Sequence, residues 1–252
     1  MTQQTTAANR LTGLCFSKDR PLQLDGYLRS MRRFVNAPTA MTVLYKATDP
    51  EIRDGYEDLK REHSDTLFLE EHDFALQLLE WLDAVRTPLV FFGCDDVVYY
   101  QPVHMPVVEQ TLREEAAVLG FSLRLGRNIH YTHTRDEAVP QPAFITEHPV
   151  LRWRWVQQAC DWGYPFEVNG TIYRVEWVRA IFHLLEKLRQ SNPLVEWRHP
   201  NYLESSANYL LKFIGQAPEE LAAFPHSCLV VPTINQVQNI ALQILYYSLH
   251  FL

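Results

Sequence analysis

Two adjacent carboxylates, Asp95 and Asp96, follow a continuous apolar run at residues 89–93. Such a run is typical of a strand covered on both faces, and the carboxyl ends of such strands are where α/β sheets bind ligands. Neighbouring carboxylates repel each other unless a cation lies between or beside them. A divalent metal carrying a phosphate would meet that need, because hard oxygen ligands suit Mg²⁺ or Mn²⁺. The alternative is a surface turn with two solvated carboxylates.

Polar residues also follow two other predicted strands. They are Ser17, Lys18, Asp19 and Arg20 after the run at 11–16, and Lys46 after the run at 41–45. Because the carboxyl ends of parallel strands share one edge of a sheet, we expect all of these residues to converge on the Asp95–Asp96 pair. This convergence favours a binding site over a surface turn.

The elements that must position these residues alternate along the first hundred residues. Strands are predicted at 11–16, 41–45, 66–69 and 89–93, and helices from Pro21, from near Pro50 to about His63, and at 74–85. Strand and helix in this order predict a parallel, doubly wound α/β half.

The second half has a less regular pattern. Helices are predicted at 107–113, 176–188 and 200–214, strands at 116–125 and 228–231, and a long polar loop, a functional lid or a disordered segment, at 127–147. The segment at 152–173 is rich in aromatic residues, which we interpret as core packing, with a sugar-binding surface as the alternative. His130, His133 and His226 are open as metal ligands, but solvated histidines are the favoured interpretation.

Composition narrows the class of protein. A net charge of −7 and a pI of about 5.8 argue against a nucleic-acid partner or a general anionic-membrane binder. The four cysteines are far apart, which predicts buried reduced thiols and neither a zinc site nor a disulfide framework. We expect a cytoplasmic location, since residues 1–10 lack the apolar part of a signal peptide and no stretch is long and apolar enough to span a bilayer.

The tail at 236–252 carries almost no charge and has an apolar helical face. Three interpretations stay open for it: docking in the core, a contact in a homodimer, or a peripheral contact with the surface of the inner membrane.

Several nucleotide-binding and catalytic motifs are absent from the sequence. There is no Rossmann fingerprint, P-loop or Gly-x-Ser-x-Gly elbow, and the chain has nine glycines in all. Phosphate binding would therefore depend on side chains and a metal.

The chain resembles the GT-A class of glycosyltransferases, the nucleotide-diphospho-sugar transferases, and in particular a poorly characterised bacterial branch. The resemblance is carried by residues 16–21, 91–97, 121–126, 161–165 and 200–204. It implies an α/β fold with a GT-A-like, doubly wound mixed sheet flanked by helices, in a single domain with an irregular C-terminal half. Residues 1–115 would be the nucleotide-sugar-binding half and residues 116–252 the acceptor-side half.

The resemblance also implies roles for the residues at the strand ends. Ser17, Lys18, Asp19 and Arg20 would line the nucleotide pocket, and Lys46 would face the base or ribose. Asp96 would hold the Mn²⁺ or Mg²⁺ that bridges the donor diphosphate, while Asp95 would contact the ribose or the metal and its water. The sequence departs from the family's D-x-D motif at the first acidic position, which is Cys94.

A transferase that inverts the anomeric centre needs a carboxylate base for the acceptor hydroxyl. Glu204 and Asp161 are the candidates for this role. The alternatives are a solvated helix residue for Glu204, and a helix cap or an ion pair for Asp161.

The leading hypothesis is thus a metal-assisted transfer of sugar from a nucleotide-diphospho-sugar to a glycan or lipid-linked acceptor. One alternative is a catalytically silent GT-A-like binding module, which Cys94 at the acidic position favours. The other is a sugar nucleotidyltransferase, although the glycine-rich basic loop expected after its first strand is missing.

Overall fold

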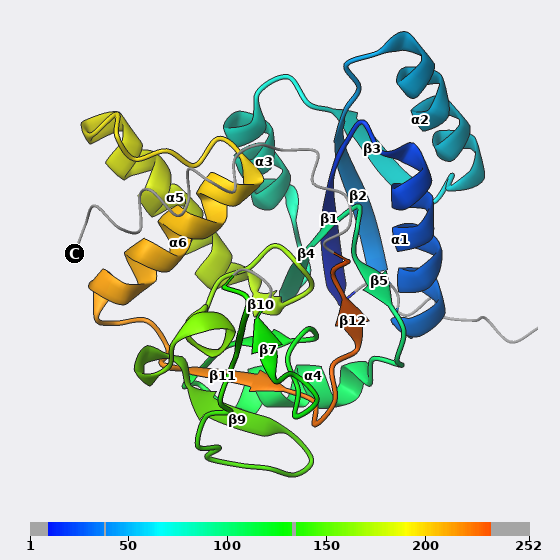
Figure 1. The fold of residues 1–252 in the computed structure, drawn as a ribbon. Coiled ribbons are helices and arrows are strands. Elements are labelled where there is room, and N and C mark those ends of the chain that lie inside the picture. The colour runs from blue at the N-terminus through cyan, green and yellow to red at the C-terminus, as the bar shows by residue number, and fades with distance from the viewer. Residues whose placement is uncertain (1–9, 38, 133–134, 233–252) are drawn as a thin grey trace, which may run out of the picture.

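The protein, described here from a computed structural model that places residues 10–37, 39–132 and 135–232, is built around one large mixed sheet (Figure 1). The sheet has eight strands in the order β3-β2-β1-β4-β10-β6-β11-β9. Its strands are β1 (Leu11–Lys18), β2 (Thr39–Lys46), β3 (Thr66–Glu70), β4 (Leu89–Cys94), β6 (Val118–Ser122), β9 (Leu151–Arg154), β10 (Ile172–Arg174) and β11 (Glu220–Ala223).

The first half has the predicted doubly wound arrangement. Strands β1 to β4 are parallel, and the helices between them are α1 (Pro21–Phe34), α2 (Pro50–Glu62) and α3 (Phe74–Ala84). Proline opens both α1 and α2, where its missing N–H costs nothing. The side chain of Asp49 caps α2 and that of Asp73 caps α3 by accepting backbone N–H bonds.

The second half makes the sheet mixed. Strand β10 is antiparallel to both β4 and β6, β11 is parallel to β6, and β9 is antiparallel to β11, so one sheet continues across residue 115. The helices are α4 (Met105–Glu114), α5 (Val175–Ser191) and α6 (Pro200–Ile214), with short 3₁₀ turns η1 (Trp155–Gln157) and η2 (Cys160–Gly163). Two small pairings join β5 (Val98–Tyr99) to β12 (Leu229–Val230) and β7 (Tyr131–Thr132) to β8 (Glu137–Ala138).

Most predicted elements agree with the structure to within two residues at each end. The exceptions are α5, which runs three residues past its predicted end, and the strand predicted at 116–125, which ends at Ser122. The Leu125 N–H donates to the Ser122 hydroxyl at 3.2 Å, so the chain turns there instead of extending. The polar loop at 127–147 is not wholly irregular, since it contains β7 and β8.

Helices cover both faces of the sheet over two apolar clusters (Figure 1). One face is covered by α3, α5 and α6, and the other by α1, α2 and α4. The aromatic segment belongs mainly to the core, as predicted: its buried residues are Trp153, Trp155, Trp162, Phe166 and Tyr173. Parallel strands buried on both faces explain the continuous apolar run of β4.

All four cysteines are free, as the spacing predicted. Cys15 and Cys228 are buried, whereas Cys94 and Cys160 are partly exposed. Among residues 10–37, 39–132 and 135–232, no helix combines the length and apolar character needed to cross a bilayer. The predictions for residues 236–252 and for His133 lie outside the described residues.

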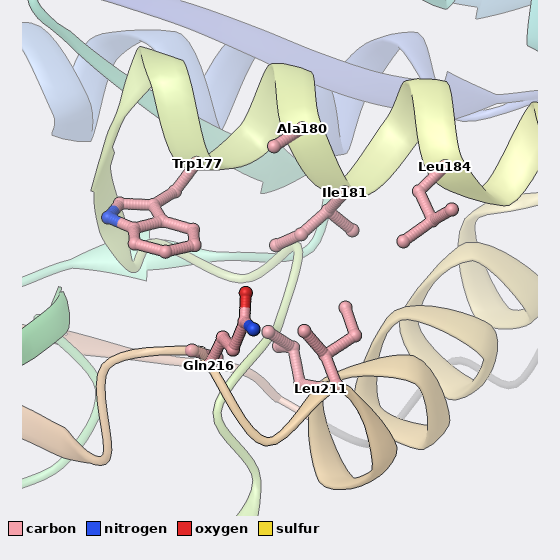
Figure 2. Close-up of a pocket in the computed structure, with 8 residues that line it drawn as sticks. Trp177, Ala180, Ile181, Leu184, Leu211 and Gln216 are labelled. Atoms are coloured by element: carbon pink, nitrogen blue, oxygen red, sulfur yellow. The ribbon is translucent and has the colours of Figure 1, made fainter.

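An apolar pocket of about 180 Å³ lies between α5 and α6 (Figure 2). Figure 2 shows Trp177 and Leu184 of α5 and Leu211 of α6 around it. The first residue of α5, Val175, donates its N–H to the Pro88 carbonyl just before β4. The start of α5 therefore lies beside the amino end of β4, and the described residues that line the pocket include no titratable group.

Candidate active site

The polar strand ends converge at one edge of the sheet, as the sequence predicted. The Ser17 hydroxyl at the end of β1 donates to Asp95 Oδ2 at 2.9 Å. The Asp19 N–H donates to the Lys46 carbonyl at 3.0 Å, which joins the ends of β1 and β2. The residues after three strands thus form one continuous surface at the carboxyl edge.

Asp95 is the buried member of the carboxylate pair, with 6% of the residue exposed. It accepts hydrogen bonds from Ser17, from the Lys18 N–H at 3.2 Å, and from the Arg20 guanidinium at 3.3 Å. Burial raises the pKa of Asp95 to about 6, and the charge of Asp96 adds to the rise, while Ser17 and Arg20 oppose it. Asp95 therefore fixes the strand-end loop and exchanges a proton closer to neutral pH than an ordinary aspartate.

Arg20 is the cation that the two adjacent carboxylates require. Its Nη1 lies 3.3 Å from Asp95 Oδ1 and 3.4 Å from Asp96 Oδ2. Burial raises the pKa of Asp96, and Arg20 counteracts that rise. Asp96 is the more accessible carboxylate, with 28% of its side chain exposed against 7% for Asp95.

Tyr56 of α2 also supports this edge, and sequence reasoning missed its role. The Ser17 hydroxyl donates its single proton to Asp95, so the Tyr56 hydroxyl must donate to Ser17, at 2.7 Å. The Tyr56 oxygen in turn accepts the Arg20 N–H at 3.2 Å. A buried tyrosine on a helix face looks like ordinary core packing in a sequence, because its hydroxyl partners come from another element.

The remaining residues of the predicted nucleotide pocket have different environments. Asp19 has a left-handed φ of 57°, and its two oxygens accept the backbone N–H and hydroxyl of Thr48 at 2.7 and 2.9 Å. Its carboxylate therefore ties two loops together. Lys18 is exposed, and Lys46 forms a solvent-facing pair with Glu71 at 3.3 Å.

A divalent metal fits this edge through Asp96. Both oxygens of Asp95 already accept hydrogen bonds. The more accessible Asp96 has one side-chain partner among the described residues, Arg20, at the long distance of 3.4 Å. Mg²⁺ often takes one or two protein carboxylates and completes its shell with phosphates and water. Within the described ranges, one group of three possible metal ligands lies within 4.8 Å of one another, and it consists of Asp25, Glu62 and His63. Both acids of that group already form ion pairs with Arg29.

Val168 lies between Glu204 and the end of β4 and is hydrogen-bonded to both. The Val168 N–H donates to Glu204 Oε1 at 2.6 Å, and the Val168 carbonyl accepts from the Cys94 thiol at 3.8 Å. Burial raises the pKa of Glu204 to about 7, and the charge of Glu167 adds to the rise, against the Val168 N–H and Arg124. A carboxyl group with this proton affinity is suited to act as a base near neutral pH.

Asp161, the second base candidate, is held in an ion pair. Arg124 Nη1 lies 2.6 Å from Asp161 Oδ1, and Arg124 Nε lies 2.6 Å from Glu167 Oε2. Burial would raise the pKa of Asp161, but Arg124 and a hydrogen bond from Thr132 outweigh it and the pKa is lowered. This environment matches the ion-pair alternative, and it makes Asp161 a weaker base than Glu204.

Two residues of this region were missed as site residues. Arg124 was visible only as a polar position in an apolar pattern, and Glu167 only as an acid among aromatics. Glu167 is buried and accepts hydrogen bonds from Ser122 and Thr171 as well as from Arg124. Charged residues within a buried aromatic segment are the signal that could have pointed to them.

No family model matches the chain. A curated relative, the bifunctional glycosyltransferase pgtA of Dictyostelium discoideum, is 28% identical over 254 residues, which cover 92% of this chain and 33% of the relative. The chain thus spans about a third of the length of that relative.

Solved structures of S. aureus TarS 1-349 are similar in fold. The complex with UDP-GlcNAc matches with a TM-score of 0.53 and 11% identity, over 92% of this chain and 60% of TarS 1-349. A second structure of TarS 1-349 matches with a TM-score of 0.50 and 13% identity, over 87% of this chain and 59% of TarS 1-349.

These likenesses confirm the predicted fold, a large mixed sheet flanked by helices in the GT-A-like arrangement. The sequence likeness to pgtA also confirms the resemblance to glycosyltransferases that the short motifs carry. The placement in a bacterial branch, the division at residue 115 and the roles of individual residues stay predictions.

Proposed function

We propose that the chain is a glycosyltransferase that moves a sugar from a nucleotide-diphospho-sugar to a hydroxyl group of a glycan or lipid-linked acceptor. The observation that carries the proposal is the juxtaposition of Glu204 with the Asp95–Asp96 strand end through the two hydrogen bonds of Val168. A base and a diphosphate-binding edge on either side of one residue are what sugar transfer requires.

On the donor side, cations at the edge would attract and orient the diphosphate. Lys18 is exposed there, and Arg20 lies against the two carboxylates. Exposed cations raise the local concentration of an anionic ligand even in a protein of net negative charge. Asp96 would hold Mn²⁺ or Mg²⁺, which when bound stabilises the charge that develops on the leaving diphosphate.

On the acceptor side, Glu204 would take the proton of the attacking hydroxyl. The hydroxyl oxygen bonds to the anomeric carbon, the bond from that carbon to the diphosphate oxygen breaks, and the proton passes to the Glu204 carboxylate. With a pKa of about 7, a substantial fraction of Glu204 is ionised at neutral pH and can accept it. Asp161 remains the second candidate, limited by its pair with Arg124.

The donor class is open to a direct test. TarS 1-349 has been solved with UDP-GlcNAc, so UDP-sugars are the first donors to examine, followed by GDP-, CMP- and dTDP-sugars. We propose a cytoplasmic site of action, where nucleotide sugars are available as donors. A ligand that binds only the folded state at about 100 times its Kd stabilises it by about 2.7 kcal/mol, which raises the melting temperature measurably.

The experiment is a thermal-shift screen of these donors with and without Mn²⁺, on the natural protein and on Asp96→Ala. We expect one nucleotide class to raise the melting temperature in a Mn²⁺-dependent way, and Asp96→Ala to lose that dependence while it stays folded. Asp58→Ala is the matched control, because Asp58 is a largely exposed aspartate in an ion pair on α2. An unchanged Mn²⁺-dependent shift in Asp96→Ala would remove the metal role.

A second test separates transfer from binding. Glu204→Gln keeps the size of the side chain and an oxygen for the Val168 N–H, but it removes the base. We expect it to bind the donor normally and to lose transfer to an acceptor by at least about a hundredfold. Full transfer by Glu204→Gln contradicts the role of base.

A silent GT-A-like binding module is the second candidate function. It is favoured by Cys94 at the first acidic position and by the way Arg20 already balances Asp95 and Asp96. Such a module would show a donor-dependent thermal shift without any release of nucleoside diphosphate. A sugar nucleotidyltransferase would instead release pyrophosphate from a nucleoside triphosphate, so product analysis separates all three.

A further inference from the structure

Glu167 is a buried carboxylate for which the mechanism above has no direct use. Only 4% of the residue is exposed, and its oxygens accept hydrogen bonds from Ser122, Thr171 and Arg124. A buried ion pair adds little net stability compared with apolar side chains of similar size, and buried charges concentrate at functional sites. Glu167 therefore calls for an explanation beyond stability.

Glu167 is linked to Glu204 through the backbone of the residue that follows it. The next residue, Val168, donates its N–H to Glu204 Oε1 at 2.6 Å. One helical turn beyond Glu204 on α6, the amide of Asn208 accepts the Phe166 N–H at 3.1 Å and donates to the Phe166 carbonyl at 2.6 Å. Residues 166–168 are thus fastened along α6, and the two glutamates keep a fixed relative position.

The titratable groups that face Glu204 come from four neighbouring parts of the chain, and the two tyrosines and the cysteine among them are neutral because their pKa values are raised. They are Glu167 and Tyr164 from the segment before β10, Tyr173 from β10, Arg124 from the turn after β6, and Cys94 at the end of β4. Of these, Glu167 favours the protonated form of Glu204 and Arg124 opposes it. Because Arg124 is shared between Glu167 and Asp161, its one positive charge faces two negative charges, and the group as a whole stays negative.

We propose that Glu167 is a positioning residue for Glu204: the hydrogen bonds of Val168 and Asn208 fasten residues 166–168 along α6 and so fix the second carboxyl group relative to the first. The neighbouring charge of Glu167 favours the protonated form of Glu204. The catalytic meaning of this arrangement rests on the proposed function, in which Glu204 is the base. The electrostatic effect itself is measurable without any substrate.

The experiment is a ¹³C NMR titration of glutamate carboxyl carbons in the ligand-free protein, with the Glu204 signal assigned by its loss in Glu204→Gln. We expect the natural protein to give a Glu204 pKa well above the ordinary glutamate value. In Glu167→Gln, removal of the neighbouring charge lowers the pKa of Glu204 by about one unit. Glu220→Gln, which alters a glutamate paired with Arg152 at 2.7 Å on β11, leaves the pKa of Glu204 unchanged.

Two results overturn the proposal. One is an unchanged Glu204 midpoint in folded Glu167→Gln. The other is an ordinary midpoint near 4.5 in the natural protein, which decides the matter even when Glu167→Gln does not fold.

The same titration separates this inference from the proposed function. The protein could show a raised Glu204 pKa that depends on Glu167 and yet neither bind nor transfer a nucleotide sugar. That result would support the inference and contradict the proposed function. Once a donor is known, the acid limb of kcat in Glu167→Gln moves to lower pH while the KM for the donor stays the same.

Discussion

Two carboxylate clusters lie on either side of Val168, and each is organised around one arginine. The strand-end cluster consists of Asp95, Asp96, Arg20 and Ser17, from the ends of the adjacent parallel strands β1 and β4. The α6 cluster consists of Glu204, Glu167, Asp161 and Arg124, from four separate places in the second half. Strand pairing brings the carboxylates and Ser17 of the first cluster together, with Tyr56 of α2 as a further support. The second cluster exists only when loops, sheet and helix have all packed.

The two clusters also differ in how their charges are shielded. Asp96 has 28% of its side chain exposed, so water and a ligand can share the charge of the strand-end cluster. Glu167 has 5% of its side chain exposed and depends on Arg124 and two hydroxyl groups. We infer that the strand-end cluster can exchange its hydrogen-bond and ion-pair partners for water or a ligand. The α6 cluster keeps its partners.

The largest expected effect comes from removing each arginine in turn. Arg124→Met leaves Glu167 and Asp161 buried without their cation, which costs about 3–5 kcal/mol of folding free energy. Arg20→Met costs about 1–2 kcal/mol, because Asp95 keeps Ser17 and the Lys18 N–H, and Asp96 reaches water. Urea unfolding of both variants measures the difference, and equal losses would break the comparison between the clusters.

A second prediction concerns the pH dependence of the α6 cluster. The pKa of Glu204 is raised from 4.5 to about 7 in the folded protein, so folding favours its protonated form. Its contribution to stability is therefore complete below pH 4.5 and is lost as the pH rises through about 7, by about 3 kcal/mol in all. Glu204→Gln should remove this loss, so that its stability relative to the natural protein increases between pH 5 and pH 8.

Urea midpoints at both pH values test this sign. Asp161→Asn is the useful contrast, because the pKa of Asp161 is lowered in the folded protein. Its ionised form contributes stability above the ordinary aspartate pKa of 3.8, and that contribution disappears as the pH falls through the lowered folded value. A parallel pH response in the two variants would mean that Glu204 and Asp161 do not differ in the way proposed.

The third prediction separates the two members of the strand-end cluster. Asp95→Ala removes the acceptor for Ser17 and for the Lys18 N–H, which costs about 1–3 kcal/mol. Asp96→Ala changes stability by less than about 1 kcal/mol, since Arg20 lies 3.4 Å from the carboxylate and the carboxylate is partly solvated. Calorimetry combined with Mn²⁺-dependent donor binding should show loss of stability in the first variant and loss of binding in the second.

The difference between the clusters also explains what the sequence could predict. The apolar run of β4, the helix caps and the three polar strand ends are local patterns in the sequence. The polar strand ends lie together because the carboxyl ends of parallel strands share one edge of the sheet. The convergence of polar residues at the sheet edge of the first half, including Asp95 with Ser17, could therefore be predicted from the sequence. Strand β10 pairs antiparallel between β4 and β6, and no local pattern announces such long-range pairing.

The α6 cluster could not be predicted, because it too depends on long-range contacts. Glu204 was identified through resemblance, but its partner is the backbone N–H of Val168, and a backbone donor leaves no trace in residue type. The pairing of Arg124 with both Glu167 and Asp161 joins residues up to 43 positions apart. Asp19 is a milder case, because its type suited a ligand-binding role and its oxygens instead bind Thr48.

Asp19 gives the smallest and most selective test of the comparison. Its φ of 57° is costly for a side chain with a Cβ and free for glycine. Asp19→Ala loses both Thr48 hydrogen bonds and keeps the strain, whereas Asp19→Gly loses the same bonds and removes the strain. We therefore expect Asp19→Gly to be about 1 kcal/mol more stable than Asp19→Ala. Both changes lie in the loop after β1, so donor binding should weaken in each while the Glu204 titration stays as in the natural protein. A shift of that titration in either variant would show that the two clusters are coupled and do not act separately across Val168.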